Sequence, residues 1–177
     1  MTKEDIRALA IWKMNLSEDS IVLDIGAGSG SITVQSARLA NKGIVYAVER
    51  KKEAIEVAKN NIKKFNCNNV KLVEGEAIDI INSLISENIR FDSIFIGGSG
   101  GDLLSILEQC NKILSKNGAL VMNFITLDNA YKAIEKMKEL KYVTDISMVT
   151  ISKNRENSYM MIGNNPIYII QCVRGEE

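Results

Sequence analysis

Hydrophobic and polar positions divide the chain into two kinds of segment that alternate. Longer stretches in which apolar residues recur every three or four positions, as at 51–65 and 128–140, predict amphipathic helices. Short, almost fully apolar runs predict buried strands at 21–25, 44–48, 70–73, 94–96 and 119–125. Strands that alternate with helices are typical of a parallel sheet with helices on both faces.

The two ends of the chain depart from this alternation. Thr2 followed by Asp5 resembles a capping box, so we expect a helix before the first strand. After residue 140, two strand-like runs at 143–151 and 167–173 flank a polar, Asn-rich loop at 152–166 that has no helical stripe. Because a parallel pair would need a helical crossover, the two runs predict an antiparallel pair at one sheet edge. We therefore expect one α/β domain over residues 1–177, with a mostly parallel sheet of seven strands whose last strand is antiparallel.

The composition excludes several kinds of catalysis and binding. The chain has 177 residues, enough for one domain with a substantial core. It carries 22 basic and 22 acidic residues, and zero net charge argues against a duplex nucleic-acid binder, which relies on a basic field. The chain has no histidine, which excludes Ser-His-Asp catalysis, Cys-His catalysis and histidine-ligated zinc. We predict neither a nucleic-acid partner nor a metal site.

The cysteines and the amino terminus indicate the compartment. Cys67, Cys110 and Cys172 lack the paired spacing of metal or redox motifs and predict buried thiols in a reduced compartment. The first 14 residues are too charged for a secretory signal, and no apolar run is long enough to cross a bilayer. We expect a cytoplasmic protein with no membrane partner.

A glycine-rich turn is the most informative motif. Gly26, Gly28 and Gly30 follow the strand at 21–25 and precede a predicted helix, so a ligand can lie against the main chain itself. About 20 residues later the next strand ends in Glu49, which places a carboxylate beside this turn. A carboxylate in that position can accept hydrogen bonds from both hydroxyls of a ribose.

The spacing of the glycines distinguishes two kinds of cofactor. Dinucleotide folds use Gly-x-Gly-x-x-Gly, whereas here the third glycine comes one residue earlier, which disfavours NAD. The run Asp24-x-Gly26-x-Gly28-x-Gly30 resembles the first motif of class I S-adenosylmethionine-dependent methyltransferases. In that superfamily the loop curls under the amino-acid portion of the cofactor, and the turn after the third strand, here 73–77, meets the adenine. The resemblance implies a Rossmann-like class I methyltransferase fold.

The fourth strand ends in a second glycine-rich segment at 97–101. In this superfamily that position faces the transferred methyl group. Enzymes that methylate exocyclic amines of bases commonly carry Asn/Asp-Pro-Pro-aromatic there, and the absence of this motif disfavours an amino-base substrate. Four glycines around Ser99 would give the bottom of the site little side-chain volume, which suits a large flat substrate. The alternative interpretation is a flexible turn before a helix at 102–114.

Four segments together resemble one family within the superfamily. Residues 1–7, 26–30, 95–101 and 121–127 are similar to the decarboxylating precorrin methyltransferases of cobalamin synthesis, the CbiT family. The resemblance implies methylation of carbon 15 of a cobalt-precorrin, with loss of carbon dioxide from the acetate on ring carbon 12. It also implies S-adenosylmethionine as cofactor, a tetrapyrrole as substrate and a homo-oligomer, a tetramer in the family. It covers residues 1 to about 127.

Candidate site residues follow from these resemblances. The predicted cofactor-binding residues are Thr2, Gly26, Ala27, Gly28, Ser29, Gly30, Glu49, Glu76 and Ala77. Because the substrate carries many carboxylates, basic or amide side chains should line its site, and we consider Lys3, Arg7 and Lys153 there. The predicted substrate-binding residues are Gly97, Gly98, Ser99, Asn123 and Arg155. We assign no catalytic acid or base, since an unsaturated tetrapyrrole can supply its own nucleophilic carbon and the protein's task is then positioning.

Other functions remain open at this point. The same fold could methylate RNA or a protein side chain, and salt-dependent RNA affinity would favour that reading. The chain could also be a non-catalytic nucleotide-binding module, which would bind the cofactor without turnover. An NAD dehydrogenase is the least favoured, and calorimetry with both cofactors would separate it.

Overall fold

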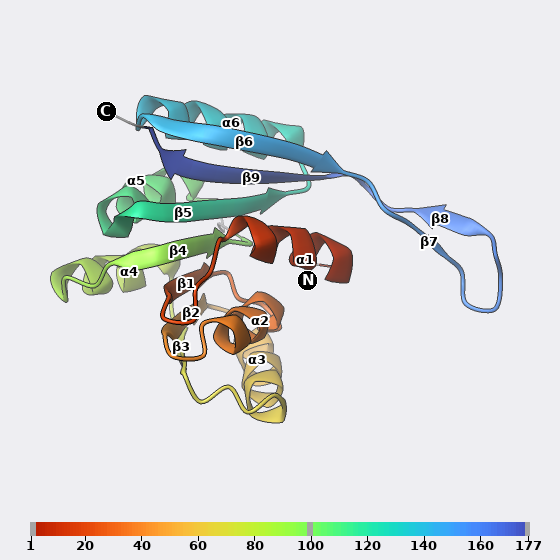
Figure 1. Ribbon diagram of the computed structural model, residues 1–177, viewed down its shortest axis with the longest axis horizontal. Helices are drawn as coiled ribbons and strands as arrows, with labels where there is room; N and C mark the ends of the chain where they lie inside the picture. The colour runs from red at the N-terminus through yellow and green to blue at the C-terminus, as the bar shows by residue number, and fades with distance from the viewer. Residues whose placement is uncertain (1–2, 99–100, 176–177) are drawn as a thin grey trace.

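A seven-stranded sheet organises the described residues, 3–98 and 101–175, in the computed structural model (Figure 1). The strand order is β3-β2-β1-β4-β5-β9-β6. The strands are β1 (Ile21–Ile25), β2 (Ile44–Glu49), β3 (Val70–Glu74), β4 (Phe91–Ile96), β5 (Leu114–Phe124), β6 (Tyr142–Val149) and β9 (Ile167–Arg174). Strand β9 runs opposite to the other six strands of this sheet and pairs antiparallel with both β5 and β6. The predicted mixed sheet is confirmed.

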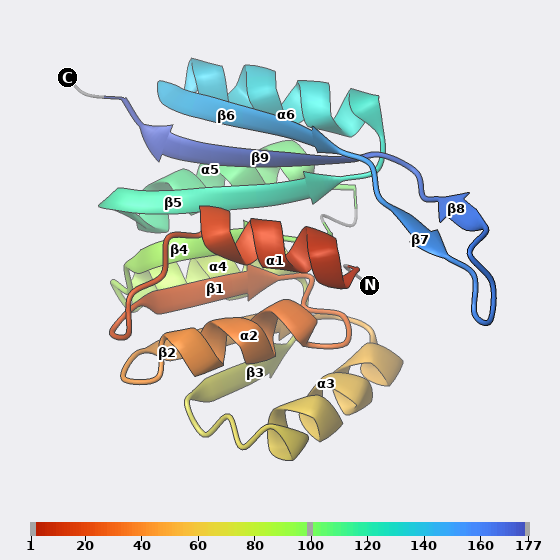
Figure 2. The same cartoon turned by 45° about the vertical axis from the view of Figure 1, so that its right-hand side comes forward.

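Helices cover both faces of this sheet, as predicted (Figure 2). They are α1 (Glu4–Lys13), α2 (Ser31–Leu39), α3 (Lys52–Lys64), α4 (Ala77–Ser86), α5 (Leu103–Ile113) and α6 (Leu127–Glu139). The first three pack on one face and the last three on the other. Each buries the apolar stripe that its sequence periodicity predicts, and burial of such stripes is the main source of stability of the layered fold. Among the described residues, no helix has the length and apolarity needed to cross a membrane.

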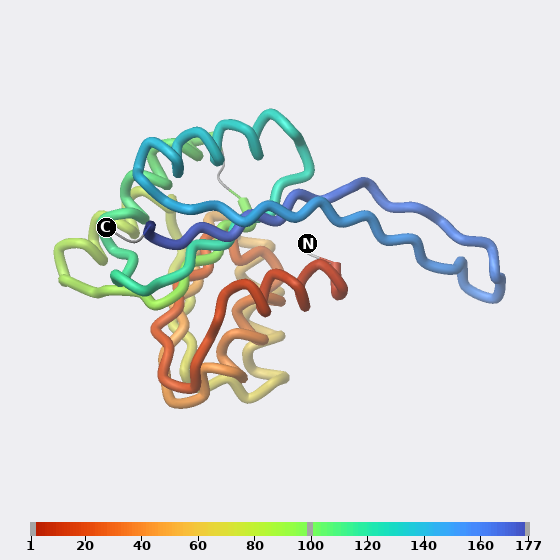
Figure 3. The backbone as a smooth tube through the Cα atoms, turned by 45° about the horizontal axis from the view of Figure 1, so that its top comes forward, coloured from red at the N-terminus to blue at the C-terminus, as the bar shows by residue number. Residues whose placement is uncertain are grey.

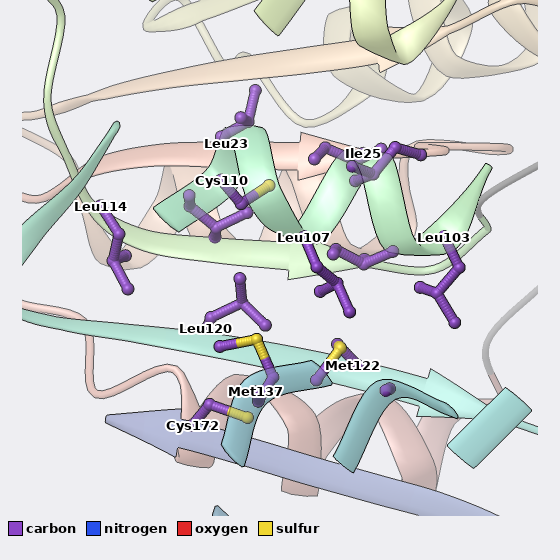
Figure 4. Close-up of a cluster of buried hydrophobic side chains, with 14 of the residues drawn as sticks. Leu23, Ile25, Leu103, Leu107, Cys110, Leu114, Leu120, Met122, Met137 and Cys172 are labelled. Carbon is purple, nitrogen blue, oxygen red and sulfur yellow. The ribbon is translucent and has the colours of Figure 1, made fainter. Parts of the chain in front are cut away.

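The core between the sheet and helices α5 and α6 is almost purely apolar (Figure 4). Leu107, Leu120 and Met137 are fully buried there. Cys110 and Cys172 pack among them as small hydrophobes, and burial raises the pKa of the Cys172 thiol to about 12. All three cysteines are free and buried, which confirms the predicted burial of the thiols.

An arm projects from the body at the end of β6 (Figure 3). It consists of β7 (Ser152–Asn154) and β8 (Met161–Gly163), paired antiparallel with Lys153 opposite Ile162. The sequence predicted a loop over 152–166, and this prediction is wrong. The two strands have only three residues each, too short a run to produce a readable alternation, and they gain their order from pairing with each other.

Two element boundaries also differ from the predicted ones. Helix α1 begins at Glu4 with Lys3 in an extended conformation at the N-cap and no side-chain cap, so the proposed capping box is not the start of this helix. Thr2 itself lies outside the described residues. Strand β5 begins at Leu114, directly after α5, rather than at residue 119, because Leu114 pairs with Phe91 before a register shift.

Candidate active site

The glycine-rich turn lies at the carboxyl edge of the sheet, between β1 and α2. Gly26 has a φ of +74°, in the left-handed region that favours glycine. Its N–H and that of Ala27 both donate to the Val48 carbonyl, at 2.9 and 3.0 Å, which holds the turn against the end of β2. A Cβ on Gly26 would lie 2.9 Å from the backbone nitrogen and oxygen of Gly98. The turn after β4 therefore touches the turn after β1 backbone to backbone.

Glu49, at the end of β2, fixes this turn. Its side chain is buried, and one carboxylate oxygen accepts a hydrogen bond from the Gly28 N–H at 2.8 Å. The other oxygen accepts from the N–H groups of Arg50 and Lys51, at 2.9 and 3.0 Å. A carboxylate has about four acceptor positions. The three backbone donors therefore leave about one position free for a ligand. The Glu49 carboxylate can thus hold the turn in place and still accept one hydrogen bond from a ligand.

A first cavity of about 470 Å³ lies beside Glu49, over the ends of β1, β2 and β3. Its lining residues are Ile25, Gly26, Gly28, Val48, Glu49, Arg50, Lys51, Ala54, Gly75, Glu76, Ala77 and Gly98. Arg50 and Glu76 form an exposed ion pair at 3.3 Å within this lining. This concave surface brings together five of the predicted cofactor-binding residues.

A second cavity of about 440 Å³ lies between the amino end of α1, the end of β5 and the base of the arm. Its lining residues are Lys3, Asp5, Ile6, Gly97, Asn123, Phe124, Ile125, Val149, Ile151, Gly163, Asn164, Asn165 and Ile167. Gly97 lines this cavity and Gly98 lines the first one, so the two cavities meet at consecutive residues. A Cβ on Gly98 would meet no atom of residues 3–98 or 101–175 within 4 Å, its two chain neighbours aside, so these residues leave the junction open.

Asp24 is a buried carboxylate behind the glycine-rich turn. The Thr33 hydroxyl donates to its Oδ2 at 2.5 Å, whereas its Oδ1 has no partner among the described residues. Burial raises the pKa of this carboxyl to about 6, against the lowering effect of the Thr33 hydrogen bond. Asp24 lines a small cavity of about 70 Å³ together with Ala27 and Ser29. An ionised, half-satisfied carboxylate in that position is suited to a cationic donor.

The remaining predicted residues are placed as follows. Thr2 and Ser99 lie outside the described residues. Gly30 lines a surface cavity that it shares with Arg7, whose guanidinium donates to Gln35. Arg155 begins the turn at the tip of the arm, where its N–H donates to the Met160 carbonyl at 2.9 Å, and it lines none of these cavities. Its role as a substrate contact stays a prediction.

Some lining residues were not predicted. Arg50, Lys51 and Ala54 line the first cavity because α3 starts directly after Glu49, a signal that was present in the sequence. The base of the arm lines the second cavity, and no local pattern predicted it because it depends on the pairing of β6 with β9.

Comparison with known proteins identifies the family. A family model described as a precorrin methyltransferase domain matches residues 1–159. The chain belongs to the precorrin methyltransferase family. A relative from Sulfurisphaera tokodaii, described as a probable cobalt-precorrin-6B C(15)-methyltransferase (decarboxylating), is 40% identical over 173 residues, which are 96% of this chain and 88% of the relative.

Solved structures agree with membership of the precorrin methyltransferase family. A precorrin-6y C5,15-methyltransferase from Geobacter metallireducens superposes with a TM-score of 0.92 and 34% identity, over 99% of this chain and 90% of that chain. A precorrin 8W decarboxylase from Methanobacterium thermoautotrophicum superposes with a TM-score of 0.88 and 27% identity, over 97% and 91% of the two chains. The predicted class I methyltransferase fold and the predicted family are both confirmed.

Proposed function

We propose that residues 1–177 form one S-adenosylmethionine-dependent methyltransferase domain that acts on a cobalt-precorrin. The reaction is methylation of carbon 15 with loss of carbon dioxide from the acetate on ring carbon 12. The observation that carries this proposal is the pair of cavities that meet at Gly97 and Gly98 in a chain of this family. One cavity suits the methyl donor and the other suits an acceptor that is a small molecule.

The residues of the first cavity, and of the small cavity behind the glycine-rich turn, fit the proposed cofactor. The unpartnered Asp24 Oδ1, behind the turn, is available to the ammonium group of an amino acid. Glu49 has about one free acceptor position for a ribose hydroxyl. Gly75, Glu76 and Ala77 give the adenine a wall with little side-chain bulk. When bound, S-adenosylmethionine supplies a methyl group activated by a positive sulfonium.

The chain's own contribution to this chemistry is positioning. Gly97 and Gly98 present only backbone at the junction of the cavities, so donor and acceptor can approach each other there. Holding two reactants in line in this way removes a large entropic part of the barrier. The buried carboxylates of Asp24 and Glu49 lie on the donor side of the junction. They therefore place negative charge near the cationic donor, away from the acceptor.

A product analysis tests the proposed function. The protein is incubated with S-adenosylmethionine and a cobalt-precorrin mixture, and the products are weighed by mass spectrometry. We expect a product that has gained one methyl group and lost one carbon dioxide. Methylation that leaves every carboxyl in place would contradict the decarboxylating reaction, and cofactor binding without any methylated product would contradict the enzyme.

We also propose that the protein is a homo-oligomer, with the arm as its interface. Tyr159 is fully exposed, and Met160, Met161 and Ile162 are each at least half exposed on the same arm. A two-stranded hairpin of this kind has no core of its own and is marginally stable in isolation. Contiguous exposed apolar side chains of this kind mark association sites. A second copy presents the same arm and supplies the matching apolar surface, and the family resemblance suggests a tetramer.

The assembly is tested by light scattering after size exclusion. We expect the wild type to elute as an oligomer and the double variant Met161→Lys, Ile162→Lys to shift to the mass of one chain, because buried lysines cannot be solvated at an apolar interface. Val57→Lys on α3 is the control, since Val57 is similarly exposed but lies off the arm. A wild type with the mass of one chain would refute the proposal.

A further inference from the structure

The second cavity has few free charges, although its proposed substrate is rich in carboxylates. Its lining includes one cation and one anion, Lys3 and Asp5. The Lys3 ammonium donates a hydrogen bond to Asn164 Oδ1. Asp5 forms an ion pair with Lys153 of the arm at 2.6 Å, and that hydrogen bond lowers the pKa of the Asp5 carboxyl. Both charged groups are therefore already partnered, in contacts that join the amino end of α1 to the arm and its base.

Among the described polar side chains that line this cavity, Asn123 has a buried amide without a partner, whereas Asn165 is exposed. It is the second-last residue of β5, and both its Nδ2 and its Oδ1 are buried without a hydrogen-bond partner among the described residues. Asn164, which lines the same cavity, accepts from Lys3 and donates to the Ile151 carbonyl at 3.0 Å. A buried amide with neither bond made costs stability, so a side chain of this kind points to a ligand.

The surroundings of Asn123 are apolar. Ile6 is buried in the cluster on this face of the sheet, and Val149, Ile151 and Ile167 pack against the same cluster while lining the cavity. A carboxylate held against these side chains would exchange water for aliphatic carbon and the neutral amide of Asn123, since Lys3 and Asp5 of the same lining are already partnered. Because poor solvation destabilises a localised negative charge, loss of carbon dioxide, which disperses that charge, would be favoured in such a place.

We propose that the second cavity is the decarboxylation subsite, and that Asn123 holds the acetate carboxylate that the substrate loses. This inference rests on the proposed function. Asn123 Nδ2 donates to one carboxylate oxygen and orients the carboxylate while the apolar walls exclude water. The bond between the acetate methylene and the carboxyl carbon breaks, and carbon dioxide leaves. The electron pair of the broken bond enters the conjugated ring. A ring carbon receives the methyl group from the sulfonium donor as the equivalent of a methyl cation, which uses that electron pair.

A neutral donor suits this role better than a cation. A lysine or arginine in contact with the carboxylate would stabilise its full charge and oppose the loss of carbon dioxide. Lys3 is bonded to Asn164 and Lys153 is paired with Asp5, so each cation already has a partner, whereas the Asn123 amide has none among the described residues. The amide that contacts the carboxyl to be lost is therefore neutral, and the cations are engaged with other groups.

The test compares the products of Asn123→Leu and of the wild type by mass spectrometry, with S-adenosylmethionine and a cobalt-precorrin mixture. Leucine keeps the shape of asparagine and removes the donor. We expect a methylated product that retains its carboxyl to accumulate, so that the ratio of decarboxylated to carboxyl-retaining product falls at least about tenfold. Asn123→Ser keeps a donor and should restore part of that ratio. Asn82→Leu, on the exposed face of α4, should leave it unchanged.

Stability and cofactor affinity separate this role from a structural one. Because Asn123 makes no hydrogen bond among the described residues, Asn123→Leu should not lower the Tm, and it should leave S-adenosylmethionine affinity unchanged. A wild-type product ratio in Asn123→Leu, a parallel loss of both products, or a lower Tm would each overturn the proposal. A wild type that forms no methylated precorrin would instead overturn the proposed function.

Discussion

Replacing Glu49 with alanine is expected to weaken S-adenosylmethionine binding by at least tenfold and to lower the Tm. The substitution leaves the N–H groups of Gly28, Arg50 and Lys51 without their acceptor. Each hydrogen bond to a charged acceptor contributes about 1.5–3 kcal/mol, so even partial replacement by water leaves a deficit larger than the 1.4 kcal/mol of a tenfold change. Calorimetric titration and thermal unfolding measure the two effects.

Glu74→Ala provides the matched control for this experiment. Glu74 ends β3 directly opposite Glu49 in the parallel register, but it is exposed and does not line the first cavity. We expect its affinity for the cofactor to change by less than about twofold, as is usual for a surface side chain. Equal affinities in Glu49→Ala and the wild type would show that the carboxylate organises neither the turn nor the ligand.

Gly26→Ala is expected to have an effect at least as large. An alanine at a φ of +74° costs about 1–2 kcal/mol in backbone strain. Its Cβ would also lie 2.9 Å from two backbone atoms of Gly98, and overpacking of this kind costs about 1–3 kcal/mol. If Gly98 moves away, the junction of the two cavities is displaced. We therefore expect cofactor affinity to fall more than about a hundredfold, together with a lower Tm.

Gly28→Ala separates strain from collision. Gly28 also has a positive φ, +56°, but a Cβ there would come no closer than 3.9 Å to the Gly26 carbonyl oxygen. This variant should therefore show the smaller loss that backbone strain alone produces. Similar losses in the two variants would mean that the contact between Gly26 and Gly98 is unimportant. The measurements are again calorimetry and thermal unfolding.

Local periodicity was enough to predict the sheet and its covering helices, because most of the strands are short and almost wholly apolar and each helix carries one apolar stripe. Periodicity could not place β9 between β5 and β6. The strand order depends on pairing between segments that are far apart in sequence, and a local pattern does not say which strand pairs with which. The arm was missed for a related reason. Residues 152–154 and 161–163 have no buried face, so no hydrophobic alternation distinguishes them from a polar loop.

The two halves of the site differ in how far the sequence predicted them. The donor side depends on short segments that follow β1, β2 and β3, so motif and spacing place Gly26, Glu49 and Ala77 together. The acceptor side joins Lys3 to Asn123 and Asn164, which are far apart in sequence and meet only in the folded chain. The sequence predicted Asn123 as a substrate contact from its amide side chain and its place on the fifth strand. The missing hydrogen bonds that give it a role are visible only in three dimensions.

The junction at Gly97 and Gly98 also divides the sequence into the segments that line each cavity. Every residue of the first cavity falls within 25–98, whereas the second draws on 3–6 and on 97–167. Changes after residue 98 can therefore remodel what is methylated without altering the lining of the donor cavity. For engineering, 149–167 is the segment to randomise when a different acceptor is sought.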